Sequence, residues 1–228
     1  IKRILIWCRN ILILLFIFSI LLVFIYKFVP VYYTTLMFIR MYEQKTVKTE
    51  HKWVSIDQIS RSMIQAVIAS EDNLFMEHNG FDVKQIKEAR DEAKKGGRVR
   101  GASTISQQTA KNVFLWPGRT YFRKGLEAYF TILIEWVWGK ERIMEVYLNS
   151  IEMGKSIYGV EAAAKNYYGK HAYQLSNGES ALIAAIHPDP RKRNPSRPSA
   201  YRQERQQDIM SLMRKIGPVE MGNRNPNP

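Results

Sequence analysis

The feature that most constrains this chain is a long stretch near its start without any charged side chain. Residues 11–26, ILILLFIFSILLVFIY, are sixteen consecutive uncharged residues. As an α-helix they would be about 24 Å long, against a hydrocarbon core of about 30 Å. The apolar run resumes after Lys27, whose ammonium can reach the interface, and Trp7 and Tyr26 occupy positions typical of interfacial aromatics. The stretch predicts one transmembrane anchor, residues 1–29.

A cleaved signal peptide is the alternative interpretation of this stretch. Its apolar core is usually shorter and is followed by small residues at a cleavage site, whereas KFVPVYYTTL contains no A-x-A pattern. Lys2, Arg3 and Arg9 precede the span, so the positive-inside tendency predicts a cytoplasmic N-terminus and an external chain after about residue 30. Lys27 and Arg40 on the far side weaken this charge asymmetry. We expect a retained, single-pass anchor.

The remainder of the sequence is typical of one folded domain. A chain of 228 residues with 46% hydrophobic and 12% aromatic residues is too apolar for a disordered polymer. Its single cysteine, Cys8, excludes an intramolecular disulfide. The apolar, aromatic residues 30–50 are expected to lie along the membrane surface. We expect the main domain over residues 51–217 and a tail over residues 218–228.

Capping signals and apolar residues at helical spacing predict a mainly helical domain. Ser55 with Gln58 resembles a capping box and predicts a helix that ends at Glu71. No segment alternates in the manner of a strand, so strands should be few. Further helices are expected over residues 82–93, 104–114, 121–138, 141–150, 159–168, 177–186 and 198–216. The helix over residues 121–138 has aromatic residues nearly all round, which predicts deep burial. The basic, glycine-rich residues 94–103 are the candidate flap.

The charge distribution points to an anionic partner. Thirty-four Lys and Arg against twenty-one Asp and Glu give a net charge of +13, which fits nucleic acid, lipid headgroups or a phosphorylated substrate. Within this basic chain, SEDNLFMEHNGFD, residues 70–82, gathers Glu71, Asp72, Glu77 and Asp82 around His78. A solvated helix end and turn would explain such acids without any chemistry.

Two polar stripes follow on neighbouring predicted helices. Gln108, Lys111 and Asn112 share one helix face, and Ser103 lies near the helix start, where backbone N–H groups are free. A solvated face would have a similar pattern.

On the next helix Arg119, Arg123 and Glu127 recur at spacings of four within an otherwise apolar segment. Without chemistry, such a stripe would be an i, i+4 salt bridge that contributes a few tenths of a kcal/mol. The two stripes alone therefore leave a structural and a functional interpretation open.

Together these segments resemble the peptidoglycan glycosyltransferases. EDNLFMEHNGFD is similar to their E-D-x-x-F-x-x-H-x-G-x-D signature, GASTISQQTAKN to the second motif, and KERIMEVYLNSIEMG to the fourth, K-x-x-I-x-E-x-Y-L-N. RTYFRKGLEA resembles the third, with its R-K-x-x-E core as Arg123, Lys124 and Glu127. Order and spacing agree over roughly residues 54–198. IHPDPRKRNPSRP departs from the fifth region at His187, where the family usually has Leu or a similar apolar residue, which leaves the contacts there open.

This resemblance implies a mainly α, lysozyme-like glycosyltransferase domain behind a single N-terminal transmembrane helix in the bacterial inner membrane, with the catalytic domain outside the cytoplasm. It implies polymerisation of lipid II into β-1,4-linked glycan chains, with inversion and release of undecaprenyl pyrophosphate. The implied partners are lipid II, the nascent glycan, the bilayer, other cell-wall synthesis proteins and moenomycin-type inhibitors, and no nucleic acid. Neither Ser-x-x-Lys nor Lys-Thr-Gly occurs, so no transpeptidase domain is expected.

The resemblance also assigns roles to residues. Glu71 would be the general base, with a pKa raised by desolvation at a buried helix end. Glu127 would either orient the pyrophosphate cations or hold a divalent cation, Mg²⁺ or Mn²⁺, against the phosphates. The residues expected to bind the donor pyrophosphate are Ser103, Gln108, Lys111, Arg119, Arg123 and Lys124. The residues expected to form the motif scaffold are Asp72, Phe75, His78, Gly80, Asp82, Asn112, Glu145 and Asn149.

Two rival functions stay open on the sequence. A lysozyme-like hydrolase or lytic transglycosylase would cut the same glycan, but it has no pyrophosphate to neutralise, so the cations would be idle. A membrane-anchored scaffold protein of the cell-wall machinery without activity is the other rival, and the intact Glu71 and Glu127 argue against it.

Overall fold

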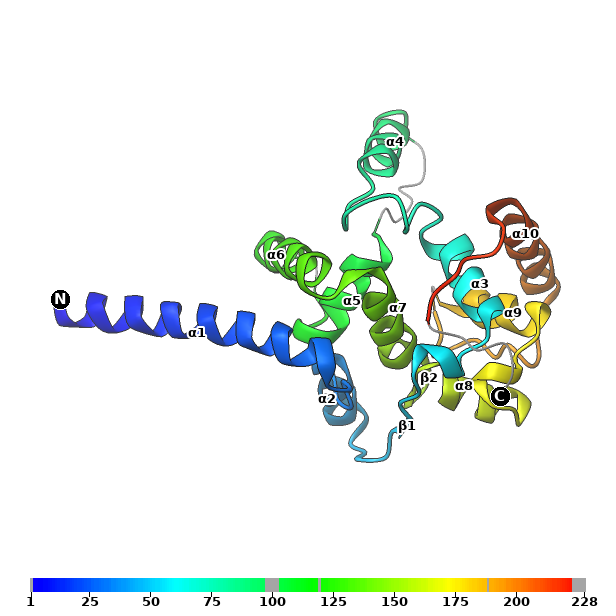
Figure 1. Ribbon diagram of the computed structural model, residues 1–228, viewed down its shortest axis with the longest axis horizontal. Coiled ribbons are helices and arrows are strands. Elements are labelled where there is room, and N and C mark those ends of the chain that lie inside the picture. The colour runs from blue at the N-terminus through cyan, green and yellow to red at the C-terminus, as the bar shows by residue number, and fades with distance from the viewer. Residues whose placement is uncertain (1, 97–102, 119, 188, 223–228) are drawn as a thin grey trace.

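A computed structural model describes residues 2–96, 103–118, 120–187 and 189–222. These residues form ten α-helices, two short 3-10 helices and one small sheet, which confirms the expected mainly helical class. Helix α1, Lys2–Phe28, extends alone from a body that the other elements build (Figure 1). In the described part of the chain, α1 is the one helix long and apolar enough to cross a membrane.

The end of α1 is fixed to the body by hydrogen bonds to its backbone. The indole Nε1 of Trp138 donates to the carbonyl of Val23 at 2.7 Å, and Arg142 donates to the carbonyl of Tyr26 at 2.8 Å. Helix α2, Thr35–Gln44, follows directly and packs on α5, where the Thr35 hydroxyl donates to the carbonyl of Val113 at 3.0 Å. The anchor and the juxtamembrane helix are therefore continuous with the folded domain.

The helix expected after Ser55 is two separate elements, so that prediction was wrong. The pair Ser55 and Gln58 belongs to the 3-10 helix η1, Ile56–Gln58, after which Ile59 has an extended backbone that buries its side chain. Helix α3, Arg61–Glu71, starts at a second cap, Ser60, whose hydroxyl accepts from a backbone N–H of the first turn. The predicted helix end at Glu71 is confirmed.

The other helices lie close to their predicted positions, and the caps explain why. Asp82 and Thr104 each accept a hydrogen bond from the backbone N–H three residues later, which satisfies a free donor of the first turn. The bounds are α4 Val83–Lys94, α5 Ile105–Phe114, α6 Tyr121–Val137, α7 Gly139–Ser150, α8 Val160–Tyr168, η2 Ala172–Gln174, α9 Asn177–Ile186 and α10 Ala200–Ile216. Residues 97–102 of the expected flap lie outside the described residues.

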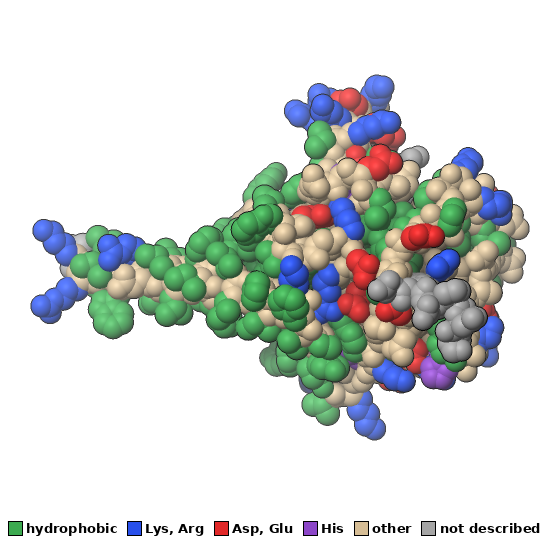
Figure 2. All heavy atoms as spheres, viewed as in Figure 1, with side chains coloured by type: hydrophobic (Ala, Val, Ile, Leu, Met, Phe, Trp, Pro, Cys, Tyr) green, Lys and Arg blue, Asp and Glu red, His purple; other side chains and the backbone are tan. Residues whose placement is uncertain are grey.

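Helix α6 is much less buried than its aromatic sequence predicted. It buries Arg123, Glu127, Thr131 and Ile134, whereas Trp136 is 83% exposed. An all-round apolar pattern fits contact with lipid as well as burial in a protein core. Helix α6 packs beside α1, and hydrophobic side chains gather along α1 and the adjoining end of the body (Figure 2). The expectation of deep burial was wrong because it considered only burial inside the protein and not contact with lipid.

The sheet is small, in agreement with the scarcity of strand patterns. Its strands are β1 Glu50–His51, β2 Glu152–Gly154 and β3 Ile157–Tyr158, in the order β1-β3-β2. β1 pairs with β3 in parallel, with Glu50 opposite Ile157, and β2 pairs with β3 antiparallel. The sheet thus joins the end of the juxtamembrane segment to the chain after α7.

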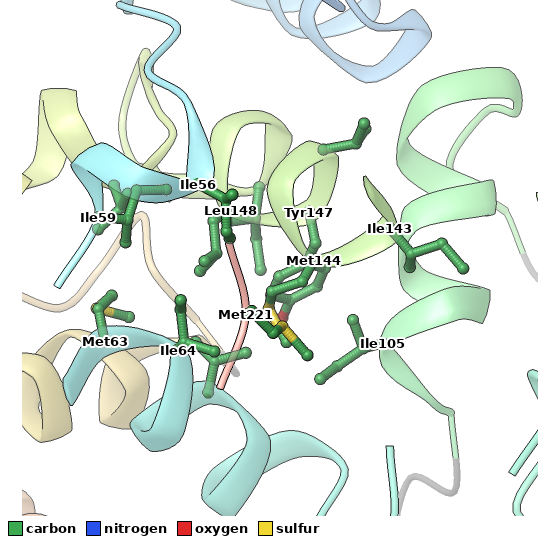
Figure 3. Close-up of a cluster of buried hydrophobic side chains, with 14 of the residues drawn as sticks. Ile56, Ile59, Met63, Ile64, Ile105, Ile143, Met144, Tyr147, Leu148 and Met221 are labelled. Carbon is green, nitrogen blue, oxygen red and sulfur yellow. The ribbon is translucent and has the colours of Figure 1, made fainter. Parts of the chain in front are cut away.

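The core joins the helices that carry the polar motifs of the sequence. Figure 3 shows side chains from η1, α3, α5 and α7 converging, among them Ile64, Ile105 and Tyr147. Met221 lies in the same cluster, and the backbone N–H of Gly222 donates to Glu141 at 3.0 Å. Residues 218–222, expected as part of a tail, therefore pack back onto the domain. One core fixes the relative positions of α3, α5 and α7.

Candidate active site

Glu71 is the last residue of α3, and its carboxylate is held by side chains from two other elements. Gln108 on α5 donates from Nε2 to Oε2 of Glu71 at 2.9 Å. His187, the residue after α9, places Nδ1 3.4 Å from Oε1. The Glu71 side chain is 18% exposed, so it is shielded but reachable. A partly open carboxylate with fixed orientation can accept a proton from a bound hydroxyl group.

The pKa of Glu71 is lowered, which contradicts the expected rise. Burial raises this pKa, but a hydrogen bond and the charge of His187, the hydrogen bond from Gln108 and the charge of Arg205 on α10 together outweigh it. The sequence-based expectation considered desolvation alone and did not include His187 or Arg205. Glu71 is therefore ionised before any substrate binds.

Asp72 connects the end of α3 to the start of α5. Its Oδ2 accepts from the backbone N–H of Ile105 at 3.0 Å, and Oδ1 lies 2.8 Å from Nε2 of His78. Nδ1 of His78 accepts from the backbone N–H of Gly80 at 3.2 Å, so Nε2 carries the proton and donates to Asp72. Gly80 has φ +87°, and a Cβ there would lie 2.7 Å from Thr131 on α6. These contacts support a scaffold role for Asp72, His78 and Gly80.

Phe75 and Asp82 contribute to the same scaffold. Phe75 is fully buried, and Nζ of Lys140 lies 4.6 Å from its ring centroid. Asp82 caps α4 by accepting from the backbone N–H of Gln85 at 2.8 Å. The turn between α3 and α4 is also tied to α5, because the hydroxyl of Thr104 donates to a carbonyl of this turn at 2.7 Å.

A second carboxylate lies on α6 within a group of cations. Glu127 is nearly buried and accepts from NH1 of Arg123 at 2.6 Å, while Lys124 contacts its other oxygen. The Arg123 side chain is 8% exposed and that of Lys124 is 48% exposed. Arg123 is thus committed to Glu127, whereas the ammonium of Lys124 also faces solvent.

Lys111 on α5 lies within electrostatic range of both carboxylates. Its pKa is lowered by burial and by the positive charges of Arg123 and Lys124, against the opposing influence of Glu127 and Glu71. Among the described residues no carboxylate is within ion-pair distance of its ammonium; Glu127 pairs with Arg123 and Lys124 instead. A partly buried ammonium of this kind is a site for an anionic group.

A cavity of about 300 Å³ adjoins Glu71 through its two partners, Gln108 and His187. Its lining includes the predicted face of α5, with Lys111 and Asn112 beside Gln108. Unpredicted lining residues come from α2 and from the chain after α5, α7 and α9: Leu36, Arg40, Leu115, Pro117, Gly118, Ile151, Glu152, His187 and Pro190. The site is therefore polar, mixed in charge and open to an extended ligand.

The residues around Glu127 do not fit a divalent cation. Both of its oxygens contact cations, and the described residues contain no cluster of three His, Cys, Asp or Glu side chains that could hold a metal. Mg²⁺ and Mn²⁺ prefer several oxygen ligands. This arrangement favours the alternative in which Glu127 orients its neighbouring cations.

Glu145 and Asn149 on α7 lie away from Glu71 and hold the fold together. Glu145 pairs with Arg142 and accepts from the backbone N–H of Ile56 at 3.0 Å. The fully buried amide of Asn149 bonds both backbone groups of Val54, at 2.9 and 2.8 Å. These bonds attach the segment before α3 to α7, in line with the expected scaffold role.

One predicted donor-site residue of the described chain, Ser103, does not line this cavity. Ser103 is half-buried and directly precedes the cap of α5, and Arg119 lies outside the described residues. Conversely, Tyr147, Arg205 and His187 near Glu71 were not predicted as site residues. Tyr147 falls within the fourth motif and His187 within the fifth region, so motif position was the one signal that could have identified them.

Comparison with known proteins gives consistent results along the chain. Residues 39–214 match the sequence model of a family described as "Transglycosylase". A protein named "Biosynthetic peptidoglycan transglycosylase" from Bacteroides thetaiotaomicron is 56% identical over 227 residues, covering 96% of this chain and 92% of that protein. Proteins of the same name are 49% identical in Caulobacter vibrioides (88% of this chain, 89% of that protein) and 43% identical in Shewanella oneidensis (97% and 96%).

Proposed function

Because this chain belongs to the transglycosylase family, we propose that it polymerises lipid II into peptidoglycan glycan chains with Glu71 as the general base. The transglycosylase domain is lysozyme-like, so the fold class expected from the sequence is confirmed. The observation that carries the mechanism is the position of Glu71, ionised and oriented, beside a cavity that also contains Lys111.

The reaction forms one C–O bond at the anomeric carbon, breaks another there, and moves one proton. The acceptor 4-hydroxyl attacks the anomeric carbon of the donor, the bond to the pyrophosphate oxygen breaks, and the proton of the hydroxyl passes to Glu71. Direct displacement converts an α-phosphate donor into a β-1,4 link. A sugar hydroxyl is a weak nucleophile, and a positioned base contributes on the order of 10²–10⁴-fold to such a step.

The leaving undecaprenyl pyrophosphate gains negative charge, which fixed cations can stabilise. Lys111 is partly buried without an ion-pair partner among the described residues, and Lys124 is half-exposed at the edge of the Glu127 group. We assign the pyrophosphate to these two residues. Glu127 holds Arg123 and Lys124 in place, and moenomycin-type phosphoglycolipids would bind through the same cations.

The anchor would place this site beside the bilayer that contains its lipid-linked substrate. Helix α1 and the exposed apolar face of α6, which includes Trp136, lie side by side and suit contact with acyl chains. With Lys2, Arg3 and Arg9 at the start of α1, the N-terminus would be cytoplasmic and the catalytic domain outside the inner membrane.

This topology predicts the behaviour of a reporter. Alkaline phosphatase fused after Pro228 is expected to be active in intact cells, because it would fold outside the cytoplasm. A cytoplasmic reporter, such as a fluorescent protein that fails to mature after Sec export, fused at the same place should stay dark. The reverse pattern would contradict the topology.

The function is tested by a pair of assays on the purified full chain in detergent. Lipid II should be converted into glycan polymer, whereas isolated, pyrophosphate-free wall glycan should stay intact. Digestion of the glycan without polymerisation of lipid II would instead support the hydrolase or lytic transglycosylase. Absence of both activities, with lipid II still bound, would support the inactive scaffold protein.

A further inference from the structure

His187 contacts the general base, yet the mechanism above gives it no task. Its side chain is 3% exposed and lies between Glu71 and Tyr147, with Nδ1 3.4 Å from Oε1 of Glu71 and 3.5 Å from the hydroxyl of Tyr147. Nε2 is buried and has no hydrogen-bond partner among the described residues. A buried imidazole with one nitrogen directed at a carboxylate usually does more than fill space in the core.

The hydrogen bonds around His187 fix where its proton lies. The hydroxyl of Tyr147 donates its single proton to Oε1 of Gln108 at 3.3 Å. Burial raises the pKa of Tyr147 well above its ordinary value, so the hydroxyl keeps that proton. Towards His187, both Tyr147 and Glu71 can then offer lone pairs only. Nδ1 must therefore carry a hydrogen.

The same hydrogen bonds fix the orientation of the Gln108 side-chain amide. Because its Oε1 accepts from Tyr147, its Nε2 is turned to Oε2 of Glu71, where it donates at 2.9 Å. The carboxylate of Glu71 thus has one donor on each oxygen, Gln108 on Oε2 and His187 on Oε1.

We propose that His187 is a positioning residue for the general base, whose Nδ1–H holds Oε1 of Glu71 in the orientation and the ionised form that the reaction requires. This inference rests on the proposed function of Glu71. His187 would touch neither substrate nor leaving group; it would act through Glu71, as the second of two donors that fix the plane of the carboxylate.

Other charged groups face this pair and are left unchanged by the test below. Arg205 on α10 and Lys111 on α5 act on Glu71 through their positive charges, and Asp72 acts on Tyr147 through its negative charge. Tyr147 itself is neutral. Their influence is common to all variants, so a difference between variants reports the contact from position 187.

The first test is the pH profile of kcat/KM for lipid II polymerisation. His187→Leu removes the donor and leaves an apolar side chain in its place. The acid limb of the profile, where the rate falls as Glu71 is protonated, should therefore move up by about one to two pH units, the shift that loss of a hydrogen bond to a charged group usually causes. His187→Asn places an amide N–H near the position of Nδ1 and should restore most of the wild-type limb. The matched control is His171→Leu, which removes the other His–Glu pair, His171 with Glu161, and should leave the limb in place.

The second test is independent of catalysis. NMR with ¹⁵N-labelled histidine should show a hydrogen on Nδ1 of His187 in the wild type, because Tyr147 and Glu71 can only accept there. An unmoved acid limb in His187→Leu, with wild type active and Glu71→Gln inactive, would overturn the positioning role. An Nδ1 of His187 without a hydrogen would also overturn it. Wild type that fails to polymerise lipid II would overturn the proposed function instead, and the NMR result would then stand separately.

Discussion

Glu71→Gln is expected to lower the rate of lipid II polymerisation by about 10²–10⁴-fold while the protein still binds lipid II. Glutamine keeps the shape of the side chain and can still accept from Gln108, but its amide cannot take the proton of the acceptor hydroxyl. Two quantities are measured for wild type and variant with lipid II: the initial rate of polymerisation and the dissociation constant. The loss should therefore appear in kcat, with the dissociation constant changed much less.

A second Glu–His pair in the same domain, with a buried Glu161 and a half-exposed His171, provides the control. Glu161 lies 2.8 Å from His171 and also accepts from the backbone N–H of Ala172 at 2.8 Å. Glu161→Gln should lower the melting temperature, since it weakens a buried hydrogen-bonded carboxylate, and should leave the rate per folded molecule nearly unchanged. If Glu71→Gln retained more than about a tenth of the activity, Glu71 would not be the base.

The pH dependence follows from the lowered pKa of Glu71. A carboxyl with a lowered pKa stays ionised to lower pH, so the free enzyme should keep its base through the neutral range and lose it only on the acid side. Binding the anionic donor nearby disfavours the ionised form and raises this pKa, which makes Glu71 a stronger base in the complex than in the free enzyme.

The sequence predicted well what local chemistry determines. The cap signals at Asp82, Thr104 and Ser176 located three helix starts, because a capping hydroxyl or carboxylate acts on the backbone two or three residues away. The end of α3 at Glu71 followed from the apolar spacing in the same way. Spacing alone also placed Gln108, Lys111 and Asn112 on one face of α5, and all three line the cavity.

What depends on contacts between distant segments could not be predicted. The pKa of Glu71 is set by His187, which is far along the chain, and by Arg205 on the last helix, and nothing near residue 71 reports them. Helix α6 packs beside α1 at the apolar end of the domain, and its exposed apolar side chains could not be predicted from the sequence of α6 alone. The chain breaks between η1 and α3 at Ile59, where the backbone is extended and the side chain is buried against residues far along the chain.

Lys111→Gln is expected to lower polymerisation by about ten- to a hundredfold, the usual effect of losing one charge-assisted contact to an anion. The amide keeps much of the length of the side chain and removes its charge. The same variant should bind moenomycin-type phosphoglycolipids more weakly by a similar factor, because they would use the same cation. Rates and inhibitor dissociation constants are measured on the full chain in detergent.

Lys170→Gln is the matched control, since Lys170 pairs with Glu179 at the start of α9 and is half-exposed. It changes the net charge equally and should alter neither measurement by more than about twofold, as is usual for exposed pairs. Wild-type polymerisation by Lys111→Gln would contradict the assignment of the pyrophosphate to this side of the cavity.

The order of effects among the cations separates direct contact from a general positive field. Lys111 is partly buried and lacks an ion-pair partner among the described residues, whereas Lys124 is half-exposed and already contacts Glu127. A direct contact with pyrophosphate should make Lys111→Gln more harmful than Lys124→Gln, because a desolvated charge interacts more strongly with an anion. A general field would instead make the two variants equal and would weaken both effects strongly with added salt, since exposed charges are screened within about 10 Å at 0.1 M ionic strength. Polymerisation rates of the two variants at low and high salt distinguish these cases.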